Sequence, residues 1–182
     1  MDTQIVEHLS AARVRRDVQN IRDALSELSA GDVARAVIRS PRYGLYVVDG
    51  TVRTGVGNQL MLADVILGTG SEIQRIYPSI PEVVPTFDPE VGGALDGLGH
   101  GDLVRVTFAT PAHGAFAITG PLTAGNDDFL LVGSWIVSAA GSVVPRVAAV
   151  ERFPEVETHA ANVPPLRSAI VEAASAPVVE AG

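Results

Sequence analysis

The chain has 182 residues, of which 47% are hydrophobic and 19% are charged, a composition typical of a folded globular protein. It contains no cysteine and no lysine, which excludes disulfides, thiolate metal sites, cysteine nucleophiles, Schiff-base lysines and Walker A phosphate loops. The formal net charge is -8, with eight arginines against seven acidic residues in 1–53 and five against fourteen in 54–182, and this acidic body disfavours general binding to nucleic acids or anionic membranes.

The N-terminal sequence lacks the order of a secretory signal. It opens with Asp2 and has no basic region followed by an apolar one. No apolar run in the chain reaches the roughly 20 residues that a membrane-spanning helix needs. We therefore expect a cytoplasmic protein, or one delivered by a non-standard route, that does not enter a membrane.

Residues 1–30 are predicted to form an N-terminal amphipathic helix. Its apolar residues recur at alternating spacings of three and four and form one stripe, and Gly31 ends the pattern. Two alternatives stay open, because the stripe can pack on its own domain or mediate self-association between copies of the chain. The candidate self-association residues are Val14, Val18, Ile21, Leu25 and Leu28.

Residues 31–67 and 101–137 align without a gap at an offset of 70. With one inserted residue the match continues and pairs Ser71 with Ser142 and Arg75 with Arg146. Identities at glycines and prolines indicate an internal duplication. The identical pairs are Gly31/Gly101, Asp32/Asp102, Arg35/Arg105, Pro41/Pro111, Gly44/Gly114, Gly50/Gly120, Gly55/Gly125, Leu60/Leu130 and Ile66/Ile136.

Each copy is predicted to form short strands separated by glycine turns. The sequence therefore predicts a mainly β fold of two tandem-duplicated, small β-barrel-like (SH3-like) units packed together. The predicted strands are 33–39, 44–49, 51–54, 59–67 and 72–77 in copy one and 103–109, 114–119, 129–137 and 143–148 in copy two. Copy one spans 31–77, a Pro/Gly-rich linker 78–100, copy two 101–153, and a partly disordered tail with a short C-terminal helix 154–182.

Catalytic and cofactor motifs are missing from the sequence, which disfavours an enzyme. The histidines His8, His100, His113 and His159 have no metal-binding spacing, and His113 is expected to be an exposed turn residue. The glycines near His100 precede a predicted strand, whereas a dinucleotide-binding fingerprint requires a helix at that place. We therefore predict no metal and no cofactor.

Arginine and aromatic residues that occur in only one copy mark a candidate interaction surface. Arg39, Arg42 and Tyr43 have Ala109, Ala112 and His113 as their counterparts. Arginine and tyrosine are frequent in contact surfaces, although these arginines could instead neutralise acidic groups of the same molecule. The candidate surface consists of Arg35, Arg39, Arg42, Tyr43 and Trp135, where Trp135 is expected to be a core or interface residue.

The leading functional hypothesis is a non-enzymatic structural or protein-interaction scaffold built on the duplicated unit, with a protein partner or a second copy of the chain. One alternative is a nucleic-acid-associated protein that uses an Arg-rich N-terminal face, with salt-dependent binding. The other is an enzyme or small-ligand binder with a pocket between the two copies, near His100 or His113.

Overall fold

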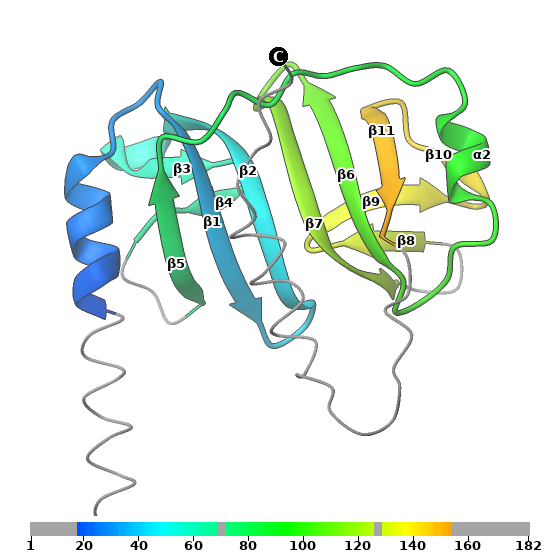
Figure 1. Cartoon of the computed structure of the whole chain (residues 1–182), viewed down its shortest axis with the longest axis horizontal. Helices are drawn as coiled ribbons and strands as arrows, with labels where there is room; N and C mark the ends of the chain where they lie inside the picture. The colour runs from blue at the N-terminus through cyan, green and yellow to red at the C-terminus, as the bar shows by residue number, and fades with distance from the viewer. Residues whose placement is uncertain (1–17, 69–71, 126–128, 154–182) are drawn as a thin grey trace, which may run out of the picture.

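The first predicted strand is present in the structure, and its side chains point alternately to the two faces of the sheet. The computed structural model describes residues 18–68, 72–125 and 129–153 and is mainly β (Figure 1). In β1 (Val33–Ser40), Ala34, Ala36 and Ile38 are buried on one side. Arg35 and Arg39 lie on the other side, because successive side chains of a strand point to opposite faces.

The described residues form two groups of strands. The first strand group is β1, β2 (Gly44–Thr54), β3 (Leu60–Leu62), β4 (Val65–Ile66) and β5 (Ile73–Pro78), with a single 3-10 turn at Val56–Asn58. The second is β6 (Leu103–Thr110), β7 (Gly114–Ala124), β8 (Phe129–Val132), β9 (Trp135–Ala139), β10 (Ser142–Val143) and β11 (Val147–Arg152). β6 and β7 begin and end 70 residues after β1 and β2.

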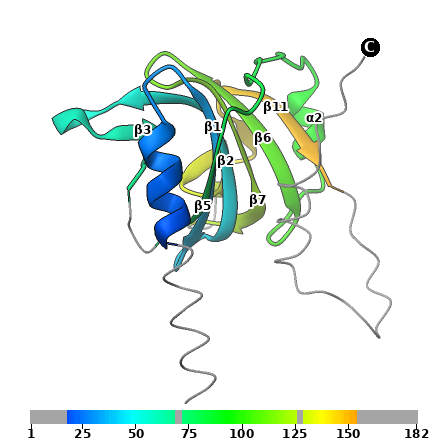
Figure 2. The same cartoon turned by 60° about the vertical axis from the view of Figure 1, so that its left-hand side comes forward.

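Both groups belong to one sheet, which is not closed into a barrel (Figures 1 and 2). β1 pairs with β2 and β5, and β6 pairs in the same way with β7 and β11. β2 changes partner along its length: residues 47–50 pair with β7, and residues 52–54 pair with β3. Because β2 and β7 pair with each other, the closed SH3-like barrels expected from the sequence are not confirmed.

The apolar runs 59–67 and 129–137 are hairpins, so the prediction of one long strand in each was wrong. In the first run β3 and β4 pair across a turn at Ala63 and Asp64, and in the second β8 and β9 pair across Gly133 and Ser134. Ala63 and Gly133 both have positive φ, at 52° and 55°. Glycine adopts that conformation without strain, but the first run has no glycine there to indicate the turn.

The prediction that Gly50 ends a strand was also wrong, because β2 continues through it to Thr54. Gly50 lies opposite Phe116 in the sheet, and a Cβ atom built on it would lie 2.8 Å from the Cβ of Phe116. Gly120 of β7 meets Tyr46 in the same way, also at 2.8 Å. Both glycines are therefore required by a close approach of two strands and not by a turn.

The predicted pairing of Arg75 with Arg146 is wrong as well. The carbonyl of Glu72 accepts a hydrogen bond from the Arg39 amide, and the carbonyl of Arg146 accepts the equivalent bond from the Ala109 amide. The last strands of the two groups therefore correspond at an offset of 74, because β10 lengthens the connection in the second group.

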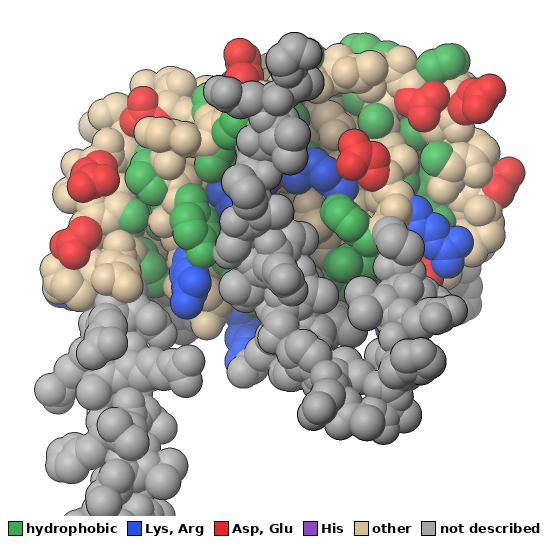
Figure 3. All heavy atoms as spheres, in the orientation of Figure 1, with side chains coloured by type: hydrophobic (Ala, Val, Ile, Leu, Met, Phe, Trp, Pro, Cys, Tyr) green, Lys and Arg blue, Asp and Glu red, His purple; other side chains and the backbone are tan. Residues whose placement is uncertain are grey.

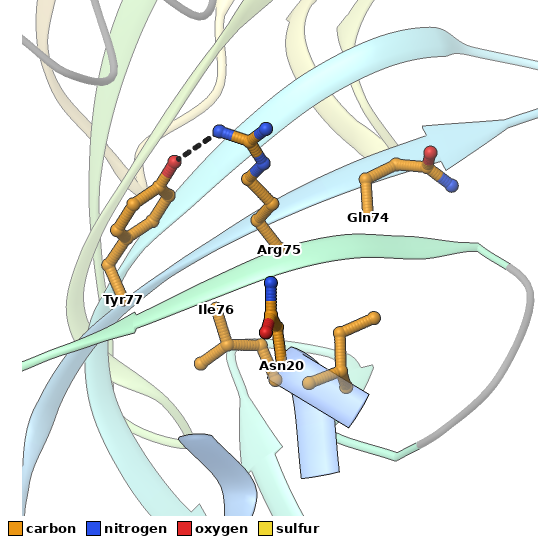
Figure 4. A pocket seen from close by; sticks show the side chains of 6 residues that line it. Asn20, Gln74, Arg75, Ile76 and Tyr77 are labelled. Atoms are coloured by element: carbon orange, nitrogen blue, oxygen red, sulfur yellow. Dashed lines mark hydrogen bonds between the residues drawn. The ribbon is translucent and has the colours of Figure 1, made fainter. Parts of the chain in front are cut away.

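The N-terminal helix is described over residues 18–27 and lies beside β5 (Figures 1 and 2). Ile21 and Leu28 are buried in the hydrophobic core, and Leu25 packs partly against it. Asn20 and Ile21 line a hollow of about 330 Å³ against β5, where Arg75 and Tyr77 point away from Ile76 (Figure 4). The helix stripe therefore packs on its own sheet.

The predicted linker contains a short helix, α2 (Val91–Leu95), which packs against β10 and β11. Leu95 is buried in the core, so this part of the linker belongs to the fold. The predicted C-terminal helix and Val14 lie outside the described residues.

Gly50→Ala is expected to lower the free energy of unfolding by about 1–3 kcal/mol, because the added methyl group would overlap with Phe116 between two hydrogen-bonded strands. Chemical denaturation followed by circular dichroism measures this change. Gly92→Ala in α2 is the control, since a Cβ there meets nothing within 4 Å, and its effect should stay within about 0.5 kcal/mol. Equal stability of the two variants would contradict the close approach.

Candidate functional site

The two strand groups meet where β2 pairs with β7, a contact that we call the seam. Val48 lies opposite Ile118, and the two positions differ by 70 in the sequence. On either side of this pair, Val47 lies opposite Thr119 and Asp49 lies opposite Ala117. Position 48 therefore pairs with its own counterpart, and positions 47 and 49 each pair with the counterpart of the other, as across the twofold axis of a symmetric dimer.

The seam is filled on the core side of the sheet. Val48 and Ile118 are both 0% exposed. Phe116 is also buried there, stacked on Phe108 at 5.1 Å between ring centroids and edge-on to Trp135 at 4.7 Å. Van der Waals packing therefore closes this side of the contact between the groups.

Asp64 adds a polar link on the same side. Its carboxylate accepts hydrogen bonds from the Ser134 hydroxyl at 2.6 Å and from the Trp135 indole N–H at 2.8 Å. Asp64 and Ser134 occupy equivalent turns of the two groups. Burial, assisted by the charge of Asp64, raises the pKa of the nearby Tyr46 to about 12.

The other side of the sheet carries the charged residues, and we call it the outer face. It consists of the side chains that β5, β1, β2, β7, β6 and β11 turn away from the core, and Figure 3 shows this side with arginine and hydrophobic side chains next to each other. Cross-strand neighbours form two rows. One is Tyr77, Arg35, Asp49, Ala117, Thr107 and Ala149; the other is Arg75, Val37, Val47, Thr119, Arg105 and Glu151.

Asp49 lies at the centre of the outer face and binds arginines of both strand groups. Its Oδ1 accepts a hydrogen bond from Arg35 Nε at 2.7 Å, and its Oδ2 accepts bonds from Arg35 Nη2 at 3.0 Å and from Arg105 Nη1 at 2.8 Å. Arg105 Nη1 also donates to the Thr119 hydroxyl at 3.3 Å. The cluster therefore ties β1, β2, β6 and β7 together.

The burial of this cluster is uneven. The Asp49 side chain is 1% exposed, whereas those of Arg35 and Arg105 are 17% and 26% exposed. The hydrogen bond to Asp49 raises the pKa of the Arg35 guanidinium group. A buried carboxylate is tolerated here because charged donors surround it.

The residues of the predicted interaction surface do not all lie together. Arg35 belongs to the Asp49 cluster, and Trp135 is buried in the core of the second group. Arg39 lines a hollow of about 450 Å³ at the β1–β2 turn. Arg42 stacks on the Tyr43 ring at 5.2 Å, and that ring packs partly against the core.

Other residues without an identical counterpart make contacts within the fold. Arg53 Nη1 donates to the carbonyl of Ala112 at 2.5 Å and so links β2 to the β6–β7 turn. His113 is half-buried and lies edge-on to Trp135 at 5.5 Å, so the expectation of an exposed turn residue was wrong. Arg146 covers Trp135 with its guanidinium group 5.0 Å from the ring centroid.

Sequence reasoning missed the central residue of this site. Asp49 follows an apolar run and looked like the end of a strand, and its partner Arg105 is 56 positions away. A comparison of the copies for acidic residues could have found it, because Asp49 has Thr119 as its counterpart.

The chemistry available at the site is ionic and hydrogen-bonding. Within residues 18–68, 72–125 and 129–153, no group of three His, Cys, Asp or Glu side chains could hold a metal ion. Within the same ranges, the helices are too short or too polar to cross a membrane. The hollows at β5 and at the β1–β2 turn are lined by the N-terminal helix and the first strand group, and a third, of about 460 Å³, is lined by α2 with the second group and flanking residues.

No protein-family model, curated protein or solved structure matches this chain.

Asp49→Asn is expected to destabilise the protein by about 2–4 kcal/mol, because it leaves two guanidinium groups facing each other without a carboxylate. Denaturant unfolding monitored by the fluorescence of Trp135, the single tryptophan of the chain, measures the change. Asp96→Asn is the control, because its exposed carboxylate makes no hydrogen bond to another described residue. If Asp49→Asn matched this control, the cluster would have no structural role.

Proposed function

We propose that this chain is a non-enzymatic protein-interaction scaffold built from two copies of one β-unit, and that the outer face over the seam is its contact surface. The observation that carries the proposal is an apolar cluster on the side of the sheet away from the core. Val37 and Val47 form its buried centre, at 4% and 3% exposed, and the half-buried Leu45, Tyr77 and Leu103 pack against them and form its accessible part. A sheet face that only contacts water is usually polar.

Arginines border this apolar cluster. Arg35 and Arg105 lie beside it in the two rows, and Arg39 is exposed opposite Leu45. Contact surfaces in proteins combine an apolar centre with a polar rim, and arginine and tyrosine are enriched in them. The composition of the outer face therefore suits a protein partner.

The two rows of the outer face support the duplication. When the first row is read from Tyr77 and the second from Glu151, Arg35 and Arg105 both come second. Asp49 and Thr119 then both come third. Each strand group then supplies half of one surface, which explains why the surface lies across the seam. This arrangement is that of a symmetric dimer joined into one chain.

Self-association remains a prediction, but the helix stripe is a poor candidate for it. Ile21 and Leu28 already pack in the core of their own chain. Copies of the chain would have to meet through another surface, and the outer face is the better candidate because the half-buried Leu45, Tyr77 and Leu103 lie on it.

The two other hypotheses also remain predictions. The arginines of the outer face favour a nucleic acid, but Asp49 and Glu151 lie in the same rows and the chain has a net charge of -8. A pocket between the copies has less support, because the core side of the seam is filled by Val48, Ile118 and Phe116.

Photo-crosslinking in the cells that make the protein tests the proposed surface. A benzoylphenylalanine at Leu45 or at Leu103, on different strand groups, is expected to give a covalent adduct with the same partner protein. The same probe at the exposed Glu90 serves as the control and should give no such adduct. Equal adducts at all three positions, or none at Leu45 and Leu103, would contradict the proposal.

A further inference from the structure

The outer face is symmetric in its arginines but not in their partners. Arg35 lies opposite Asp49, and the equivalent Arg105 lies opposite Thr119. One carboxylate, that of Asp49, therefore accepts hydrogen bonds from two guanidinium groups. In the second strand group the position that corresponds to Asp49 carries a hydroxyl instead.

This difference leaves Arg105 with unused donors. Arg35 binds both carboxylate oxygens of Asp49 through Nε and Nη2. Arg105 uses only Nη1, which it shares between Asp49 and Thr119. Its Nε and Nη2 have no acceptor among the described residues, and its side chain is 26% exposed, so a ligand can reach it.

Glu151 is the acidic side chain nearest in register to Arg105, since it lies opposite it on β11. No ion pair joins the two, and Glu151 is exposed. The Arg152 side chain beside it binds Asp102 at 3.4 Å. The carboxylates that surround Arg105 in the described part of the chain therefore leave its outward donors free.

We propose that Arg105 is the docking point for one carboxylate of an acidic peptide segment of the partner, a proposal that rests on the function proposed above. The planar guanidinium group binds a carboxylate through two parallel hydrogen bonds. The half-buried Leu103 lies two residues before Arg105 on the same face of β6 and fits a peptide with an apolar side chain next to its acidic one.

The pseudo-symmetry supplies a direct test. Thr119→Asp places a carboxylate opposite Arg105, where Asp49 stands opposite Arg35. It occupies the outward donors of Arg105 from within the chain and should exclude the ligand. Thr119→Asn is the matched control, because it has nearly the same shape without the negative charge.

The probe is fluorescein-labelled hexaglutamate, titrated with the full chain at low salt and followed by fluorescence anisotropy. We expect binding by the wild-type chain, a change below about threefold in Thr119→Asn, and a loss of at least about tenfold in both Thr119→Asp and Arg105→Gln. Inorganic phosphate at matched ionic strength should compete more weakly than glutamate peptides. Stronger competition by phosphate would overturn the carboxylate assignment.

Three other results would overturn the proposal: no binding of hexaglutamate to the wild-type chain, wild-type affinity in Thr119→Asp, or equal losses in Thr119→Asp and Thr119→Asn. If Thr119→Asp does not fold, Arg105→Gln decides, because Arg35 still binds both oxygens of Asp49 and the glutamine amide remains a donor. If any of these results is found but crosslinked adducts still form at Leu45 and Leu103, only the carboxylate site is contradicted. The proposed scaffold function is then still supported.

Discussion

The carboxylate of Asp49 binds two guanidinium groups that belong to different strand groups. Its side chain is almost fully buried, and a buried carboxylate without charged donors would cost several kcal/mol. Arg35 and Arg105 must therefore stay in place, which fixes the register of β1, β2, β7 and β6. A shift of one residue would turn Asp49 toward the apolar core. The cluster thus specifies which strands meet, and apolar burial supplies most of the stability.

The seam is apolar on the core side of the sheet and ionic on the outer face. On the core side, Val48, Ile118 and the Gly50–Phe116 contact bring the strand groups close together. On the outer face, the same strands hold charged side chains at fixed positions above a packed core. A binding surface on rigid strands is more precise than one on loops, so the outer face suits recognition of a partner.

The sequence predicted the class of the fold, the helix stripe and the correspondence of the first two strands, because each leaves a local pattern. Predictions from the sequence failed where the residue type did not indicate the local backbone conformation. Gly50 looked like a turn residue although it permits a close strand contact, and Ala63 gave no sign of the turn that it forms. The candidate site was missed for another reason: Asp49 and Arg105 are 56 positions apart, and a contact across two strand groups has no local signature. Asp49 nevertheless differs between the copies, as the arginines and aromatic residues do, because Thr119 is its counterpart.

The central claim is that the seam makes the two strand groups one cooperative unit. Ala36 in β1 and Val106 in β6 are equivalent positions, and both are fully buried. Denaturant titration followed by the intensities of these two amide signals in 1H–15N NMR spectra tests the claim directly. The account predicts that both native signals disappear with the same midpoint. Two separate midpoints, with one strand group still folded after the other has unfolded, would contradict it.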